Sequence, residues 1–425
     1  MKLWKWFYPG IGLKRWIFLF ILSCLVIIIG ILSFLHYFTT PLVEAKVDFM
    51  LLNKLFSGSV IYGIMIMMIG SFISIFSLKK LMLKINTENK KIVDSLYKKK
   101  KLKRGASISA LGGGTGLSNL LRGLKQETSN INAIVTVADD GGSSGKLRDE
   151  LGMPPPGDIR NCLVALADTE PLMEELFQYR FSAEGHLVGH SFGNLFIASM
   201  NQVLGDFEDA VRESSKVLAV KGQVLPATKD NVQLEAEYKD GSREVGESLI
   251  PLIDKKIERV YLKPGNCRAS ERSISALRTA EIITVGPGSL YTSILPNLII
   301  KDIVRTIKAS DAPVVYICNV MTQPGETDNY SASDHVRAIT RHVGEQIFDW
   351  IIVNRESVPQ DVARRYREEG AFPVEYKVNE LKEMGLKVRS AELLQRKEEQ
   401  FIRHDPQKLA EVVLEIARNG SGGMK

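Results

Sequence analysis

The hydrophobic pattern divides the chain into two unlike parts. Residues 16–38 and 59–78 form two long apolar runs that contain no Asp, Glu, Lys or Arg. A helix of about 20 residues crosses the ~30 Å hydrocarbon core of a bilayer, and each run is long enough to do so. The first run exceeds the roughly 7–15 apolar residues of a cleaved signal peptide, and no small-residue cleavage motif follows before Pro41. The pattern therefore favours a two-helix membrane hairpin over a cleaved signal peptide.

From Ser107 onward, short β-rich runs alternate with amphipathic stretches, which is typical of a parallel sheet covered by helices. We expect strands at 107–111, 131–137, 281–285, 313–318 and 349–353. We expect helices at 116–126, 158–168, 170–180, 192–204, 206–218, 331–345 and 405–418. Residues 232–248 predict a small antiparallel hairpin insertion that turns at Asp240-Gly241.

These patterns predict four segments. They are a membrane hairpin (1–78), a basic juxtamembrane linker (79–104), an α/β domain (105–418) and a flexible tail (419–425). The KKKKLKR run at 98–104 would be attracted to anionic lipid head groups by about 1 kcal/mol per basic residue near the surface. A solvated flank of the second apolar run is the alternative. Either interpretation keeps the α/β domain near a membrane.

Charge is distributed as unevenly as hydrophobicity. The 425 residues carry a net charge of +6, but residues 1–104 hold 17 Lys and Arg against four Asp and Glu, which leaves the remainder at −7. The positive-inside rule places both outer flanks of the hairpin, and with them the main domain, in the cytoplasm. An acidic domain argues against nucleic acid as the main partner. The four widely spaced cysteines indicate neither a zinc site nor a disulfide framework, and they fit a reducing cytoplasm.

The first candidate ligand loop follows the first expected strand. Ligands of parallel α/β sheets bind beyond the carboxyl ends of the strands, near a topological switch point. Glycines at 112, 113, 114 and 116 allow a tight turn there, and the helix that follows points its free N–H groups at an anion. The dinucleotide fingerprint is absent, because Leu117 stands where G-x-G-x-x-G needs its last glycine. The turn predicts a phosphate cradle, with a purely structural connection as the alternative.

The second loop, 138–146, contains two adjacent carboxylates. Asp139 and Asp140 lie near the position where an acidic residue often accepts ribose hydroxyl hydrogen bonds, and such a pair could also bind a cation. A turn or N-cap role is the alternative. The loop is not a P-loop, because Asp140 replaces the first glycine and Leu147 replaces the Ser or Thr that would hold magnesium.

Two further polar segments follow. Asp158 is expected to cap a helix that carries Arg160 in its first turn, where an arginine could pair bidentately with phosphate. His186 and His190 have the i,i+4 spacing of helical metal ligands. Because Gly189 argues against a helix and no cysteine is near, a hydrogen-bonding loop is favoured over a zinc site.

The third and fourth loops complete the expected cleft. Residues 286–291 (GPGSLY) form a second glycine-rich turn, whose Tyr291 is available to stack on a base. Opposite the first turn, this segment could enclose a diphosphate. Residues 319–328 are polar and turn-rich, and they predict a lid or a wall on the sugar side of the cleft.

These segments together resemble one protein family. GGGTGLSNLLRGLK, AIVTVADDGGSSGKLRDELGMPPPGDIRNCLVALAD, GHSFGNLFIA, PGNCRAS, VGPGSLYTSILPNLI and CNVMTQPGETDNYSASDHV are similar to the gluconeogenesis-factor proteins of the YvcK-like branch. That branch shares a superfamily with the 2-phospho-L-lactate transferases (CofD-like). The resemblance runs from about Ser107 to past residue 350. It implies a Rossmann-like three-layer α/β domain with a mainly parallel sheet, which binds UDP-sugars such as UDP-N-acetylglucosamine and supports growth and cell shape on gluconeogenic carbon sources.

Carried over position by position, the resemblance implies a set of residues that line the nucleotide-sugar cleft. They are Gly112, Gly113, Gly114, Thr115, Gly116, Asp139, Asp140, Arg160, Asn161, Asn194, Gly286, Gly288, Ser289 and Tyr291. No catalytic residue and no metal ligand is assigned. The long signature DDGGSSGKLRDELGMPPPGD is that of the regulatory branch, and it favours binding without turnover.

The sequence thus predicts a membrane-tethered, cytoplasmic nucleotide-sugar-binding regulator that couples precursor supply to envelope synthesis or morphogenesis. Cell-envelope synthesis proteins and a second copy of the chain are the candidate protein partners. The alternative is a transferase, in which Asp139 and Asp140 hold Mg²⁺ while Arg160 and the glycine turns stabilise a transferring phosphoryl group. A tubulin-like GTPase would need a glycine where Ser118 stands. The binding predictions require the 112–116 and 286–291 turns to meet in space.

Overall fold

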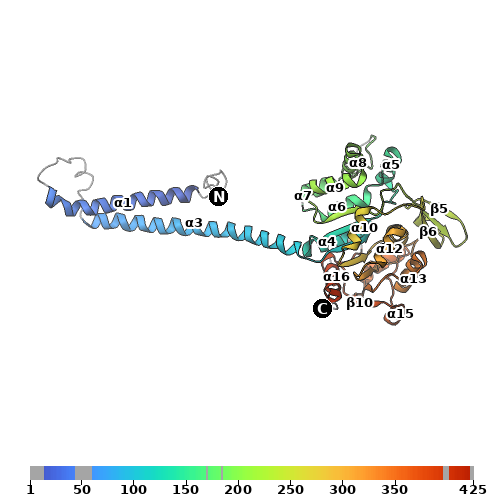
Figure 1. Cartoon of the computed structure of the whole chain (residues 1–425). Coiled ribbons are helices and arrows are strands. Elements are labelled where there is room, and N and C mark those ends of the chain that lie inside the picture. Colours follow the sequence, from blue (N-terminus) through green and yellow to red (C-terminus); the bar gives the residue numbers. More distant parts are fainter. Residues whose placement is uncertain (1–13, 44–59, 169–170, 183–184, 396–401, 422–425) are drawn as a thin grey trace. The chain divides into compact units, whose positions relative to one another are not determined.

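The computed structural model describes residues 14–43, 60–168, 171–182, 185–395 and 402–421, and it divides into two compact units, 1–100 and 101–425. The first unit contains helix α1 (Lys14–Val43) and most of α3 (Val60–Lys103) (Figure 1). Helix α3 continues without a break through the expected linker, so residues 79–103 are helical. Residues 44–59 lie outside the described residues, as do the last four residues of the expected tail.

Helices α1 and α3 pack closely through glycines. A Cβ atom at Gly30 would lie 2.7 Å from Met67 Cγ, and one at Gly70 would lie 2.7 Å from Ile27 Cγ1. Close approach at small residues is the usual packing of membrane helices, because lipid provides no hydrophobic drive for their association. Residues 15–35 and 63–82 are long and apolar enough to cross a membrane. Side chains such as Phe72, 73% exposed, point away from the helix pair.

The second unit is built on a parallel sheet in the order β10-β9-β8-β7-β1-β2-β3. Its strands are β1 (Ile108–Gly112), β2 (Ile131–Val135), β3 (Gln223–Pro226), β7 (Ile282–Val285), β8 (Val314–Ile317), β9 (Trp350–Asn354) and β10 (Lys387–Ala391). Every neighbouring pair is parallel. The chain adds strands to one side of β1 as far as β3 and then crosses to the other side at β7. The order therefore reverses between β1 and β7, and this is the switch point of a doubly wound fold.

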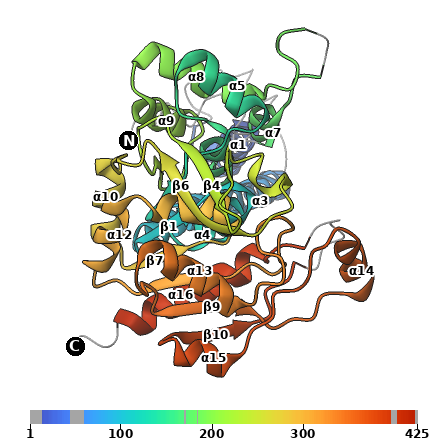
Figure 2. The ribbon, with the colours of Figure 1, turned by 90° about the vertical axis from the view of Figure 1, so that its right-hand side faces the viewer.

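Two groups of helices cover this sheet. The first group contains α4 (Gly114–Glu127), α5 (Gly142–Leu151), α6 (Gly157–Leu166), α7 (Pro171–Gln178), α8 (Phe192–Leu204), α9 (Phe207–Val217) and α16 (Pro406–Ser421). The second group contains α10 (Glu271–Arg278), the π-helical segment η3 (Leu290–Ile294), α11 (Leu295–Leu298), α12 (Lys301–Lys308), α13 (Ala332–Val343), α14 (Gln360–Glu368) and α15 (Val378–Glu383). Helix α4 packs on α6 and α16, whereas α11 packs on α12 and α13. Helices α10 and α12 also lie side by side (Figure 2). Crossovers that run in opposite directions from β1 place their helices on opposite faces, since each crossover is right-handed. The expected three-layer α/β class is confirmed.

The antiparallel insertion is present and larger than expected. Strands β4 (Gln233–Tyr238) and β5 (Arg243–Val245) form the predicted hairpin, with Gly241 at φ +83° in the turn. A third strand, β6 (Ile257–Lys263), pairs with β4, and the single-turn helix η2 (Ile250–Leu252) lies between β5 and β6. The expected helix 192–204 has the predicted bounds, and the other expected elements of the α/β domain differ by a few residues.

Two strands of the main sheet escaped prediction. Strands β3 and β10 lie at the two edges of the sheet, where β3 begins with an exposed glutamine and β10 is only partly buried. Central strands such as β1 and β7 are buried on both faces and therefore form continuous apolar runs. Edge strands lack that signal, which is why hydrophobic pattern alone did not identify them.

Candidate functional site

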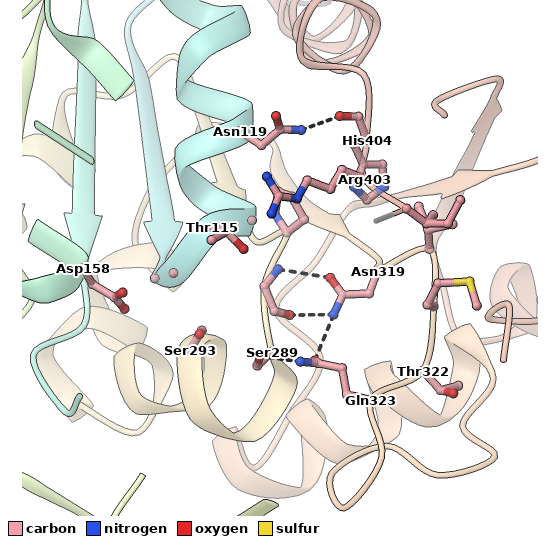
Figure 3. A pocket seen from close by; sticks show the side chains of 18 of the residues that line it. Thr115, Asn119, Asp158, Ser289, Ser293, Asn319, Thr322, Gln323, Arg403 and His404 are labelled. Atoms are coloured by element: carbon pink, nitrogen blue, oxygen red, sulfur yellow. Dashed lines mark hydrogen bonds between the residues drawn. The ribbon is translucent and has the colours of Figure 1, made fainter. Parts of the chain in front are cut away.

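A cavity of about 470 Å³ opens at the carboxyl ends of β1, β2, β7 and β8. Its walls are the first glycine turn, the loop after β2, the second glycine turn and the loop after β8 (Figure 3). Pockets for small organic ligands typically measure about 300–1,000 Å³, and in this fold they lie at the switch point. We call this space the switch-point cavity.

The two glycine turns meet at this cavity. A Cβ atom at Gly116 would lie 2.5 Å from the carbonyl oxygen of Pro287, so only glycine permits this approach. Asn297 links the first turn to the helical segment that follows the second, because its Nδ2 donates to the Gly112 carbonyl at 3.1 Å and to the Ser293 carbonyl at 2.8 Å. The spatial condition on which the binding predictions depend is therefore met.

The first turn directs the start of α4 into the cavity. The first N–H groups of a helix have no partner within it, and the helix dipole makes this end positive. Gly114, at φ +60°, adopts a conformation that favours glycine. Its backbone N–H donates to the carboxyl of Asp158. Asp158 was expected to cap its own helix, but the N-cap of α6 is Pro156, and the carboxyl reaches the start of α4 instead.

The loop after β8 holds the second turn in place. Asn319 exchanges two hydrogen bonds with Gly288, accepting from its N–H at 3.1 Å and donating to its carbonyl at 3.0 Å. Gln323 donates to the Ser289 hydroxyl at 2.7 Å. Buried Glu326 accepts from the Tyr291 N–H and from the Thr292 hydroxyl, both at 3.1 Å. Residues 319–328 are thus a clamp on the turn as well as a wall of the cavity.

We expect Asn319→Asp to destabilise the domain by about 1 kcal/mol, near the lower end of the usual cost of leaving a polar group without its partner, because Asn319 and Gly288 are only partly buried. The aspartate keeps the acceptor for the Gly288 N–H but sets a carboxylate oxygen against the Gly288 carbonyl. Urea unfolding of the two proteins measures the difference. Asn379→Asp, on the exposed face of α15, is the matched control. Equal losses for both variants would contradict the clamp.

One end of the cavity is acidic. Asp139, Asp158 and Glu247 line it, and Asp140 does not. Burial, followed by the charge of Asp139, raises the pKa of Asp158 to about 7. Burial, followed by the charges of Asp139 and Asp158, raises the pKa of Glu247 to about 8. These carboxyls repel one another, so hydroxyl donors, protons or a cation would stabilise this end.

The paired aspartates of the second loop have different roles. Asp139 accepts a hydrogen bond from the Gly141 N–H at 2.9 Å and remains at the cavity. Asp140 accepts from the Ser248 N–H at 2.8 Å, and it thereby anchors the segment that carries Glu247 into the cavity. Within the described ranges, no group of three His, Cys, Asp or Glu side chains is arranged to hold a metal ion. A joint magnesium site of Asp139 and Asp140 does not fit this geometry.

Half of the fourteen expected residues line the cavity. Those that do are Gly113, Gly114, Thr115, Gly116, Asp139, Gly288 and Ser289, and those that do not are Gly112, Asp140, Arg160, Asn161, Asn194, Gly286 and Tyr291. Gly112 ends β1, and Gly286, at φ +84°, shapes the second turn.

Arg160, Asn161 and Asn194 connect helices instead. Arg160 donates to the hydroxyl of Ser191 and to Asn161 Oδ1, and Asn194 Nδ2 donates to the Ser143 hydroxyl at 3.1 Å. The bonds from Arg160 to Ser191 and from Asn194 to Ser143 tie α6 and α5 to α8, and the bond between Arg160 and Asn161 lies within α6. His190 Nδ1 lies 3.0 Å from the same Ser143 hydroxyl in a non-helical segment, so the prediction of a hydrogen-bonding loop is confirmed.

Tyr291 is the clearest correction. Its side chain is fully buried, and its hydroxyl lies 2.9 Å from that of Tyr330. Burial raises the pKa of this phenol above its ordinary value. The ring also packs edge-on against His342 at 5.9 Å, away from the cavity. Tyr291 therefore supports the second turn from behind and is not placed to stack on a base.

The sequence interpretation missed the wall that comes from the C-terminal part of the chain. Tyr366, Ile402, Arg403 and His404 line the cavity, with Asn119 of α4 beside them. Asn119 Nδ2 donates to the His404 carbonyl and so holds this segment against α4 (Figure 3). Arg403 is the only Lys or Arg among the described lining residues. No local motif marks these positions, because their placement depends on contacts with α4, far away in the sequence.

The fold and this site define a doubly wound, Rossmann-like α/β protein with a glycine-lined cavity at its switch point. The sequence profile of the family described as "2-phospho-L-lactate transferase CofD" matches residues 108–394. The gluconeogenesis factor of Bacillus subtilis is 51% identical over 311 residues, which cover 73% of this chain and 98% of that protein. The chain belongs to the CofD family, in its gluconeogenesis-factor branch.

Other relatives differ in how much of the chain they cover. A Nostoc relative is 46% identical over 96% of this chain, while the gluconeogenesis factor of Halalkalibacterium halodurans covers 73% of this chain and 96% of its own length. A crystal structure of a UPF0052 family protein from Bacillus halodurans has a TM-score of 0.71 and 50% identity, and it covers 73% of this chain and 99% of that one. That extent is close to the length of the second unit, so a related chain of about this size folds on its own.

Proposed function

We propose that the second unit binds a nucleoside-diphosphate sugar in the switch-point cavity and acts as a regulator during growth on gluconeogenic carbon sources. UDP-N-acetylglucosamine is the first ligand to test. The observation that carries the proposal is the contact between the Gly116 turn and the Pro287 turn, which brings the start of α4 and a second glycine turn to one cavity. Backbone N–H groups at such turns are a common diphosphate site.

The rest of the cavity has complementary chemistry. Arg403 offers the positive charge that phosphate oxygens require, at the wall formed by the C-terminal part of the chain. Asp139 and Glu247 at the acidic end are hydrogen-bond acceptors for ribose or sugar hydroxyls. A ligand with a charged centre and hydroxyl-rich ends matches this division of the walls.

The main test is ligand-induced stabilisation of residues 101–425. A ligand that binds only the folded state stabilises it by RT ln(1 + [L]/Kd), or about 2.7 kcal/mol at 100 times Kd. We expect UDP-N-acetylglucosamine to raise Tm and Arg403→Gln to weaken its affinity by about tenfold or more. Arg364→Gln on α14, whose side chain is 82% exposed, is the matched control. An unchanged Tm at millimolar ligand would overturn the proposal.

We further propose that the hairpin tethers the domain to the membrane. Two apolar helices long enough to span a bilayer support this, together with the basic residues that flank them. The full chain should sediment with membranes and resist extraction at high salt, whereas residues 101–425 should stay in the supernatant. Release of the full chain by salt would mean electrostatic adsorption through the 98–104 run, and the tether would be wrong.

The transferase alternative is less well supported by the geometry. It needs Asp139 and Asp140 to hold Mg²⁺ together, but Asp140 accepts a hydrogen bond from the Ser248 N–H and does not line the cavity. Arg160, which was expected to stabilise the transferring group, is bound to Ser191 and Asn161 instead. The family name alone favours transfer chemistry, and metal-dependent consumption of a nucleotide-linked substrate would establish it.

A further inference from the structure

A second cavity of about 490 Å³ lies elsewhere on the domain, and no residue lines both. It is bounded by β6, by the end of α11 with α12, and by the end of α13. It is therefore as large as the switch-point cavity and separate from the glycine turns. We call it the basic cavity.

The charge of its lining is one-sided. Arg259, Lys301, Arg305 and Lys308 line it, and the described lining residues include no Asp or Glu. Such a lining is unlike the rest of the domain, because residues 105–425 carry a net charge of −7. A concentration of positive charge within an acidic protein attracts anions.

Two of these cations lack a carboxylate partner. Arg305 lies 3.5 Å from Asp302, and Lys308 pairs with Glu345. Arg259 donates to the carbonyl of Arg341, a neutral acceptor. Across the described part of the chain, neither Arg259 nor Lys301 forms an ion pair, so their charges are available to a ligand.

Most of the remaining wall is aliphatic, with Tyr261 and Cys267 as further lining residues. Val260 and Leu298 are buried side chains, and Ile299 and Val304 are only partly covered. His342 adds no free polar atom, because Nε2 accepts from the Val260 N–H at 3.0 Å and Nδ1 bonds to the Ala338 carbonyl at 2.7 Å. An occupant would therefore meet cations on one side and aliphatic surface on the other.

We propose that the basic cavity binds an amphipathic organic anion. Arg259 and Lys301 hold its phosphate or carboxylate group, and its apolar body lies against Val260 and Val304. The chemistry is the inverse of the acidic, hydroxyl-accepting end of the switch-point cavity. Residues 290–299 border both spaces, since Ser293 lines one and Ile299 the other, so an occupant would contact the helical segment that follows the second glycine turn.

The test uses residues 101–425 and hexyl phosphate as the probe, with hexanol and inorganic phosphate as its two halves. Isothermal titration should show hexyl phosphate binding more tightly than either half, because each half meets only one kind of wall. The double variant Arg259→Gln/Lys301→Gln should lose about tenfold or more in affinity. Lys239→Gln/Arg278→Gln removes the same charge from exposed positions outside the cavity and should leave the affinity unchanged. Both variants must keep the wild-type Tm.

A second experiment, which measures binding to lipid vesicles, identifies the source of the anion. The anion is a lipid head group if the protein sediments with phosphatidylglycerol vesicles but not with phosphatidylcholine vesicles, and if the double variant loses this sedimentation. Hexyl phosphate binding without vesicle binding would assign a soluble metabolite of the same chemistry. The proposal is overturned if millimolar hexyl phosphate does not bind, if inorganic phosphate binds as tightly, or if the control variant loses as much affinity as the double variant.

Discussion

Gly116→Val should abolish ligand binding and destabilise the domain by about 1–3 kcal/mol, the usual cost of overpacking a closely packed site. The added Cβ would lie 2.5 Å from the Pro287 oxygen and 2.8 Å from its carbonyl carbon. Both are backbone atoms, so no side-chain rotation relieves the contact. The turns would have to separate, and the cavity they enclose would change shape.

The measurement is Tm of residues 101–425 with and without UDP-N-acetylglucosamine. Gly265→Ala is the control, because its Cβ would meet no atom closer than 3.6 Å and its backbone is not in the left-handed region. The variant Gly116→Val should show a lower Tm and no ligand-dependent increase. Retention of the full ligand shift would mean that the ligand site does not depend on the contact between the turns.

The affinity of the switch-point cavity for UDP-N-acetylglucosamine should weaken as the pH rises from 6.5 to 8.5. Burial and neighbouring carboxylates raise the pKa of Glu247 to about 8 and that of Asp158 to about 7. An anionic ligand favours the protonated carboxyls that line the cavity, and each coupled proton changes affinity by up to about tenfold per pH unit. Glu247→Gln should bind more tightly at pH 8.5 and show a shallower pH dependence.

The control for this experiment is Glu244→Gln, a nearby glutamate of β5 that does not line the cavity. Titration calorimetry at the two pH values measures the affinities. Affinity that increases with pH would contradict the prediction, because a ligand bridged by a divalent cation requires ionised carboxylates. The direction of the pH dependence thus also separates direct anion binding from metal-assisted binding.

The free energy of unfolding without ligand should also decrease as the pH rises. The folded-state pKa values of these carboxyls lie above their ordinary values, so the folded state binds more protons than the unfolded state. Their contribution to the free energy of unfolding is therefore greatest at low pH and is lost as the pH rises through about 7 to 8.

Much of the fold was predictable because its signals are local. Apolar runs without charge mark α1 and the start of α3, and the buried central strands β1, β7 and β8 are short β-rich runs. Glycine turns are recognisable because only glycine adopts certain backbone conformations without strain. Each of these properties belongs to a few consecutive residues, so a single sequence reveals them.

The composition of the site was predictable only in part. The glycine turns and Asp139 line the cavity as expected, but Asp140 faces Ser248 and Tyr291 is buried against Tyr330. Neighbours in sequence can point in opposite directions, and the direction depends on what each side chain packs against. A motif identifies the loop, whereas tertiary contacts decide which atoms of that loop meet a ligand.

The sequence by itself determined the helical hairpin, the parallel α/β class and the two glycine turns, because hydrophobic periodicity and backbone preference act over short distances along the chain. Only the tertiary structure decided that Glu247 completes an acidic end, that Arg403 supplies the single described cation of the cavity, and that a second cavity carries four more. Those residues come from segments far apart in sequence, and long-range packing, such as the hydrogen bond from Asn119 to the His404 carbonyl, brings them together.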